Sequence, residues 1–141
     1  MKTKINELYI KAKKGKSALP CEELRLLENQ GALGDIFCAK DSKRQICILF
    51  ESSIEKLDAL KENGVCAKRF TSNIVLSGAF FDGIKIGTSF KIGDALLTVT
   101  QIGKECLGFC GDESCPLTME AIFARVSAGG LIKKGDDVCY A

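Results

Sequence analysis

The chain has 141 residues, 46% hydrophobic and 27% charged, with a formal net charge of +2. This length suits one domain with its own core, and so small a charge argues against a nucleic-acid-binding surface. No apolar run approaches the about 20 residues of a membrane span, and the N-terminus lacks an apolar core of signal-peptide length. We therefore expect a single cytoplasmic domain over residues 1–141, with no membrane contact.

Three segments before residue 80 predict strands, and a fourth is ambiguous. Apolar and polar residues alternate in LYIKAKK (8–14), which indicates a half-buried strand. The run RQICILF (44–50) is typical of a buried strand, and SNIVLSG (72–78) predicts another. The segment CEELRLLENQG (21–31) fits either a helix or a short strand.

Two segments predict helices. SSIEKLDALKENG (52–64) is the clearer one, because Ser52 and Glu55 have the spacing of a capping box. The second helix is predicted within LTMEAIFARVSAGG (117–130), with Thr118 as its cap. Its expected apolar stripe consists of Ile122, Phe123 and Val126.

Glycine-aspartate pairs divide the second half into short β-prone runs. KIGDALLTV (91–99) and KKGDDVCY (133–140) both have the order strand, Gly-Asp turn, strand. Such pairs favour tight reversals, since glycine adopts positive φ and aspartate bonds its own backbone. The total is six to eight strands and two helices. We predict a mainly β (α+β) fold, a small barrel or strongly bent sheet, because closure removes exposed edges.

Three of the eight cysteines, Cys106, Cys110 and Cys115, lie within ten residues of each other. The chain has no histidine, so catalytic Ser-His-Asp and Cys-His pairs and histidine-bearing zinc motifs are excluded. The cluster can be a zinc or iron–sulfur site, a redox pair, or the position of one reactive thiolate near Lys104. The other five cysteines are interpreted as small buried hydrophobes or incidental thiols: residues 21, 38, 47, 66 and 139.

Polar and basic residues flank three predicted strands. They are Lys14, Lys16 and Ser17 after the first, Lys43 and Arg44 before the second, and Arg69, Thr71, Ser72 and Asn73 before the third. If these turns gather at one rim of a barrel, their donors suit a phosphate group. The alternative is an ordinary solvated set of surface charges.

Several segments, in this order and spacing, resemble the MOSC domain from about residue 7 to the end of the chain. They are KKGKSALP (13–20), NQGALGD (29–35), RQICILFESSIEKL (44–57), RFTSNIVLSG (69–78), IGTSFKIGDALLTVTQIGKEC (86–106) and MEAIFARVSAGGLIKKGDDV (119–138). The family's fold is a β-barrel-like mixed sheet with a few short helices. Small stand-alone bacterial members are the nearest in appearance.

The resemblance implies a set of site residues for the molybdenum cofactor (molybdopterin). In the family's reductases one cysteine is the protein ligand to molybdenum, which maps to Cys106, the candidate catalytic and metal-binding residue. The Arg-x-x-x-Asn block that lines the cofactor pocket maps to Arg69 and Asn73, with Ser72 inside it. The pterin phosphate is expected to be bound by Lys16, Ser17 and Arg44.

Three functions follow as expectations. The first is a carrier that delivers the cofactor, or sulfur, to a partner molybdoenzyme through Cys106. The second is a molybdenum-dependent reductase of N-hydroxylated compounds, with a flavin or iron–sulfur redox partner. The third is a zinc-thiolate protein. Related bacterial members often carry histidine near the cysteine, and this chain has none, which favours the carrier.

Overall fold

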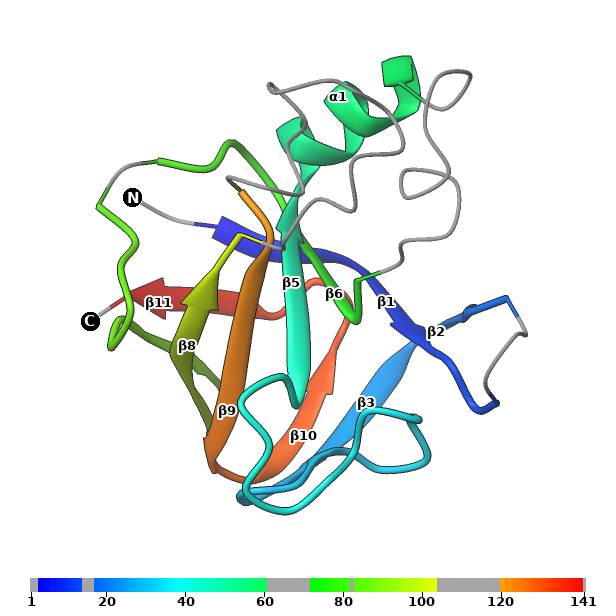
Figure 1. The fold of residues 1–141 in the computed structure, drawn as a ribbon, viewed down its shortest axis with the longest axis vertical. Helices are drawn as coiled ribbons and strands as arrows, with labels where there is room; N and C mark the ends of the chain where they lie inside the picture. Colours follow the sequence, from blue (N-terminus) through cyan, green and yellow to red (C-terminus); the bar gives the residue numbers. More distant parts are fainter. Residues whose placement is uncertain (1–2, 14–16, 61–71, 82, 104–119, 141) are drawn as a thin grey trace.

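The computed structural model describes residues 3–13, 17–60, 72–81, 83–103 and 120–140. Within these ranges the chain forms eleven strands and one helix (Figure 1). The elements are β1 (Thr3–Ile10), β2 (Leu19–Cys21), β3 (Glu23–Leu27), β4 (Gly31–Ala32), β5 (Ile46–Phe50), α1 (Glu51–Leu60), β6 (Ile74–Leu76), β7 (Ser89–Ile92), β8 (Ala95–Ile102), β9 (Ile122–Ala128), β10 (Gly130–Lys133) and β11 (Asp137–Tyr140). No helix in the described ranges is long and apolar enough to cross a membrane.

Seven strands close into a barrel in the order β11-β7-β8-β9-β5-β6-β1, and pairing between β11 and β1 completes the ring. Strand β2 extends it beside β1. All neighbouring barrel strands are antiparallel except β5 and β6, which run parallel. A parallel pair needs a crossover connection, and α1 lies in that connection. The expected barrel is confirmed, with more strands than the predicted six to eight.

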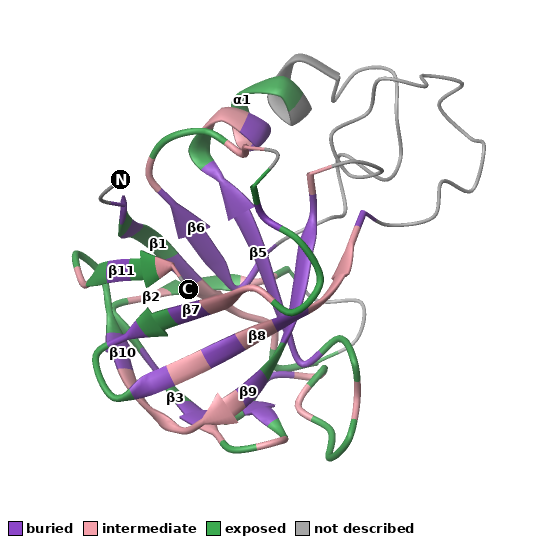
Figure 2. Ribbon diagram, turned by 90° about the vertical axis from the view of Figure 1, so that its left-hand side faces the viewer, coloured by how far each residue is buried: buried purple, intermediate pink, exposed green. Residues whose placement is uncertain are grey.

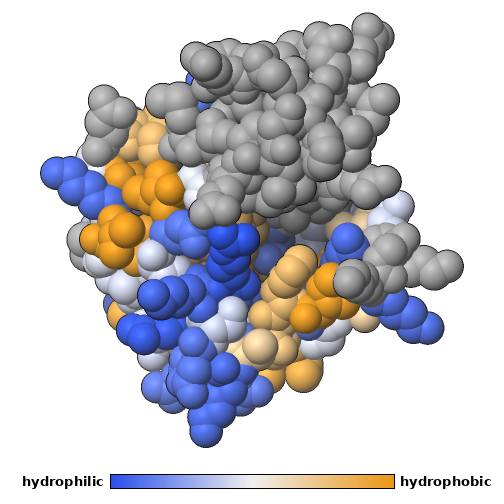
Figure 3. Space-filling model, in the orientation of Figure 1, coloured by the Kyte–Doolittle hydropathy of each residue, from blue (hydrophilic) through white to orange (hydrophobic). Residues whose placement is uncertain are grey.

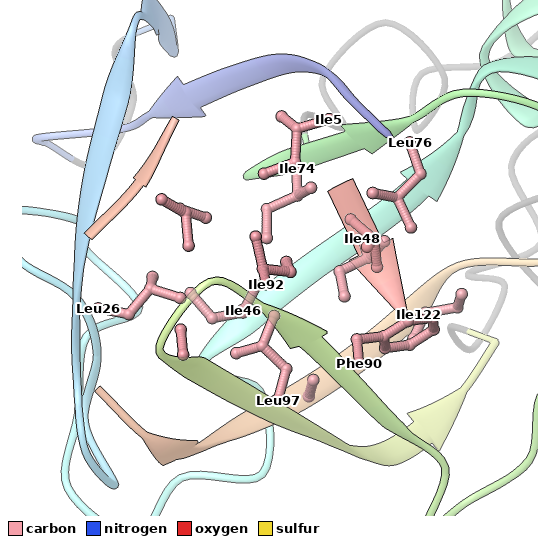
Figure 4. Close-up of a cluster of buried hydrophobic side chains, with 14 of the residues drawn as sticks. Ile5, Leu26, Ile46, Ile48, Ile74, Leu76, Phe90, Ile92, Leu97 and Ile122 are labelled. Carbon is pink, nitrogen blue, oxygen red and sulfur yellow. The ribbon is translucent and has the colours of Figure 1, made fainter. Parts of the chain in front are cut away.

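A second sheet, β10-β3-β4, packs at one end of the barrel and shares its core. The ambiguous segment 21–31 therefore contains a strand, β3. The buried side chains of both sheets form one cluster (Figure 4), in which Leu26 of β3 and Ile46 of β5 belong with Leu97 of β8. Burial of this apolar surface is the main stabilising contribution to the fold.

Strand β5 is buried on both faces, which explains its uninterrupted apolar sequence. Ile46, Ile48 and Phe50 belong to the barrel core. Cys47 and Leu49 alternate with them and so face outward, yet they too are buried. Figure 2 accordingly draws β5 in the colour of buried residues. The outer face of β5 is therefore buried rather than exposed to solvent.

The predicted helix within 117–130 is wrong, because Ile122–Ala128 forms strand β9. The apolar residues Ile122, Phe123 and Val126 fit a helical stripe, but they also fit a strand buried on both faces. Pairing with β8 on one side and β5 on the other decides between them. Such tertiary pairing overrides local propensity.

The helix α1 was predicted, but it begins at Glu51 and Ser52 is not its cap. The chain passes directly from β5 into the helix. Gly78, just beyond β6, supports its first turn: the Ser52 nitrogen donates to the Gly78 carbonyl over 3.1 Å, and the Gly78 nitrogen donates to the Glu51 carboxylate over 3.2 Å. The predicted helix extends to residue 64, and its last four residues lie outside the described residues.

The two Gly-Asp pairs have different outcomes. Gly93 has φ +58 and turns β7 into its antiparallel partner β8, as predicted. Gly135 also turns, with φ +87, but β10 and β11 do not pair with each other. They enter different sheets, so the predicted order of strand, turn, strand is present, but this turn does not close a hairpin. A turn residue fixes the local bend but not the partner that each strand finds.

Candidate functional site

Three of the predicted site residues lie at one end of neighbouring strands. Arg44 precedes β5, and Ser72 and Asn73 precede β6. Because β5 and β6 are parallel, these starting ends meet. Strand β1 runs antiparallel to β6, so its final residues reach the same end before the loop that contains the exposed Ser17. The remaining predicted residues, Lys16, Arg69 and Cys106, lie outside the described residues.

Asn73 joins two strands through both its backbone and its side chain. Its Oδ1 accepts a hydrogen bond from the Cys47 nitrogen at 3.0 Å, and its own nitrogen donates to the Cys47 carbonyl at 2.9 Å. Its Nδ2 donates to the Tyr9 carbonyl at 3.4 Å. The Asn73 side chain is thus hydrogen-bonded to Cys47 of β5 and to Tyr9 of β1, and it stabilises the packing of these strands.

Ser72 differs sharply from its neighbour. It is only 2% exposed, and its hydroxyl has no hydrogen-bond partner in the part of the chain that the structure describes. A buried polar group without a partner costs about 1–3 kcal/mol, so such groups are rare and ask for an explanation. A bound ligand is one explanation, because it would accept the hydrogen bond that the Ser72 hydroxyl does not make to the described residues.

Arg44 is held over an aromatic ring. Its guanidinium carbon lies 4.9 Å from the centre of the Phe123 ring, and its Nε donates to Gln101 Oε1 at 3.2 Å. The ion pairs found in the described residues, Lys4 with Asp137 and Lys56 with Glu120, do not involve it. Arg44 is therefore a cation positioned by a ring and an amide, and no carboxylate among the described residues pairs with it. Figure 3 shows mainly hydrophilic surface over the part of this face where Figure 1 draws β9 and the loop before β5.

These residues belong to one row across the outer face of the barrel. The strand register sets Gln101 of β8 opposite Phe123 of β9, and Phe123 opposite Cys47 of β5. Asn73 continues the row beyond Cys47. We call Gln101, Phe123, Cys47 and Asn73 the cross-strand row, with Arg44 above Phe123. Sequence reasoning missed Gln101 as a functional candidate and assigned Phe123 to a helix, because only the register brings them to Arg44.

The cysteine-rich segment leaves and rejoins the barrel beside this row. The Gly103 nitrogen donates to the Ala121 carbonyl at 2.7 Å, which closes the ends of β8 and β9 on either side of residues 104–119. Glu120 accepts hydrogen bonds from Ser53 and Lys56 of α1, at 2.8 Å and 2.9 Å. Cys106, Cys110 and Cys115 themselves lie outside the described residues, but the residues on both sides of their segment are held by these hydrogen bonds.

Two of the described thiols outside the row, Cys21 and Cys38, have a pKa above the ordinary value. Burial raises the pKa of the Cys21 thiol, and nearby Glu22 adds to the shift. Burial and Asp35 act in the same direction on the pKa of Cys38. Within the described ranges, no three cysteine or carboxylate side chains group closely enough to hold a metal ion.

Comparison with known proteins agrees with this architecture. The family model for the MOSC domain matches residues 30–139. The fold is similar to that of the YuaD protein from Bacillus subtilis, with TM-score 0.75 and 19% identity over 98% of this chain and 94% of that one. It is also similar to YiiM from Escherichia coli, with TM-score 0.65 and 21% identity over 100% and 70%. YiiM from Geobacillus stearothermophilus gives 0.66 and 17% over 99% and 75%. The curated proteins contain no match to this sequence.

Proposed function

This chain belongs to the MOSC domain family, and from that premise we propose that it binds the molybdenum cofactor through Cys106 and delivers it, or sulfur, to a partner molybdoenzyme. The family is associated with this cofactor. The proposal concerns a binding and transfer role rather than turnover of a small substrate. The cofactor, when bound, supplies a redox-active metal held by a pterin dithiolene.

The observation that carries the proposal is the buried hydroxyl of Ser72, which has no hydrogen-bond partner among the described residues. It lies beside Asn73, at the strand ends where Arg44 also lies. A pterin with a phosphate presents polar ring atoms at one end and an anion at the other. Ser72 offers a hydrogen bond for the first and Arg44 a charge for the second. The described residues therefore fit the chemistry of this group.

Connectivity supports a place for Cys106 near the same surface. It follows Gly103 by only three residues in the sequence. Gly103 in turn accepts a hydrogen bond from Gln101, which holds Arg44. By the same reasoning Arg69 is three residues from Ser72, and Lys16 is adjacent to Ser17.

A cysteine thiolate suits both forms of the proposed role. It is a soft ligand, which favours soft metal centres. In sulfur transfer, the Cys106 thiolate attacks the outer sulfur of a donor persulfide. A new S–S bond forms at Cys106 while the donor's S–S bond breaks, and the donor leaves as a thiolate. Neither role requires an imidazole, and the chain contains no histidine.

A transfer assay separates delivery from reduction. Protein loaded with cofactor is mixed with a cofactor-free molybdoenzyme, and recovery of that enzyme's activity is followed. We expect recovery to rise with the amount of loaded protein and to fail with the Cys106→Ser variant. If recovery is absent while a reductase partner supports turnover of a hydroxylamine, the carrier role is wrong and the chain is a reductase.

A further inference from the structure

A bulge near the end of β8 turns one polar side chain outward. The register with β9 shifts between Val99 and Gln101. Val99 belongs to the core, and strict alternation would send the residue two positions later to the core as well. The bulge instead places Gln101 opposite Phe123, on the outer face, and returns Ile102 to the core side. Bulges commonly re-aim a side chain in this way.

The two bulge residues hold two consecutive residues of the loop before β5. Thr100 Oγ1 donates to the Lys43 carbonyl, and it also contacts the Phe123 carbonyl at 3.1 Å. Gln101 Oε1 accepts the Arg44 Nε–H at 3.2 Å. The backbone before Arg44 and the base of its guanidinium are therefore fixed by the same bulge.

The orientation of the Gln101 amide is itself set. Its Nε2 donates to the Gly103 carbonyl at 2.8 Å, which leaves Oε1 to face Arg44. With Nε engaged and one face covered by Phe123, the Arg44 guanidinium keeps its two terminal amino groups. Among the described residues these groups have no acidic partner. The two amino groups lie in one plane and together form a fork of donors, which suits an anion that accepts two hydrogen bonds at once.

We propose that Gln101 is a positioning residue, which sets the Arg44 guanidinium as a fork for a phosphate group. Gln101 itself does not touch the anion and acts through Arg44. If the proposed function holds, the phosphate is that of the pterin cofactor. The fork depends only on described residues, and it can be tested with inorganic phosphate whether or not molybdenum is bound.

The test is a titration of the protein with inorganic phosphate, followed by isothermal titration calorimetry, which measures the affinity of every variant in the same way. We expect Gln101→Met to weaken phosphate binding about tenfold, the loss associated with one hydrogen bond to a charged group. Gln101→Glu is expected to weaken it further, because its carboxylate pairs with Arg44 and competes with the anion. Gln30→Glu, the same charge change at an exposed position, is the matched control and leaves binding unchanged.

A double-mutant cycle separates positioning from a general effect on the fold. Lysine keeps the charge of Arg44 but lacks its Nε–H and its planar fork, so Gln101→Met in an Arg44→Lys background should cost nothing further. Equal losses in both backgrounds, wild-type affinity in Gln101→Met, or no phosphate binding by the wild type would each overturn the proposal. Molybdenum retention by the same variants tests the proposed function separately. Retention of the metal requires Cys106, whereas binding of inorganic phosphate by Arg44 does not.

Discussion

The side-chain oxygen of Asn73 accepts a hydrogen bond from the backbone nitrogen of Cys47, although the two residues are 26 positions apart. The backbone nitrogen of Asn73 returns a bond to the Cys47 carbonyl. The asparagine thus extends the ladder between β5 and β6 by one side chain, at the strand ends that also carry Ser72 and Arg44. The surface proposed to bind the cofactor is built on this contact.

Asn73→Ala is expected to lower the free energy of unfolding by about 1–3 kcal/mol, because it leaves a buried backbone nitrogen without its acceptor. Urea denaturation measures the change. Asn6→Ala, at an exposed position of β1, is the control and should change stability by less than about 0.5 kcal/mol. Equal stability of the two variants would show that the Asn73 bridge contributes nothing.

Ser72→Ala should affect cofactor retention without harming the empty protein. Removing an unpartnered buried hydroxyl leaves the free energy of unfolding unchanged or raises it by up to about 1 kcal/mol. Retention of pterin by the loaded protein should fall. Denaturation of the empty protein and pterin fluorescence after gel filtration provide the two readings.

The second buried serine of the described chain is the natural comparison for Ser72. Ser53 is fully buried as well, but its hydroxyl donates to Glu120 at 2.8 Å. Ser53→Ala should therefore destabilise the protein by about 1 kcal/mol or more. If Ser72→Ala destabilises the empty protein as much as Ser53→Ala does, then Ser72 has a structural partner and the argument for a ligand there is lost.

Tyr9 should ionise unusually late in an alkaline titration. Its hydroxyl donates to Glu7 at 2.7 Å, and this bond, with burial and the Glu7 charge, raises the pKa of Tyr9 from 10.0 to about 12. Because the folded-state pKa is the higher one, the stabilisation is complete below pH 10 and is lost between about pH 10 and pH 12. Absorbance of the phenolate in a Tyr140→Phe background reports Tyr9 alone, since the chain has two tyrosines.

Glu7→Ala should return the Tyr9 midpoint toward 10, and Glu28→Ala, at another exposed acidic position, should not. An unchanged midpoint in Glu7→Ala would show that the hydrogen bond to Glu7 does not cause the raised pKa of Tyr9.

Thiol labelling should divide the cysteines by reactivity. Burial and the neighbouring acids Glu22 and Asp35 raise the pKa of Cys21 and of Cys38 above 9.0, so few of these thiols are ionised at neutral pH. Their alkylation by iodoacetamide should be slow and should accelerate as the pH passes 9. A functional Cys106 thiolate should label faster at pH 7. Mass spectrometry of timed samples measures each site, and faster labelling of Cys21 or Cys38 would contradict this order.

Local signals predicted part of the fold well. The run ICILF predicted β5 because both faces of that strand are buried, and Gly93 predicted the β7–β8 turn because its backbone needs positive φ. The same signals misplaced β9, since the spacing of Ile122, Phe123 and Val126 suits a helix and a doubly buried strand equally. Only the pairing partners, distant in sequence, distinguish the two.

The candidate site was predictable in its residue types but not in its geometry. Arg44, Ser72 and Asn73 were expected near strand ends, and the parallel pairing of β5 with β6 brings those ends together. The contact of Arg44 with Phe123 and the contact with Gln101 depend on a one-residue bulge in β8. No pattern within the β8 sequence alone identifies such a bulge, because it results from pairing with β9.

The central claim is tested most directly by the molybdenum and pterin content of protein purified from a host that makes the cofactor. The wild type and Cys139→Ser, which replaces an exposed cysteine of β11, are predicted to retain molybdenum. Cys106→Ser is predicted to lose it. Equal molybdenum in Cys106→Ser and the wild type, or zinc in place of molybdenum in the wild type, would contradict the account.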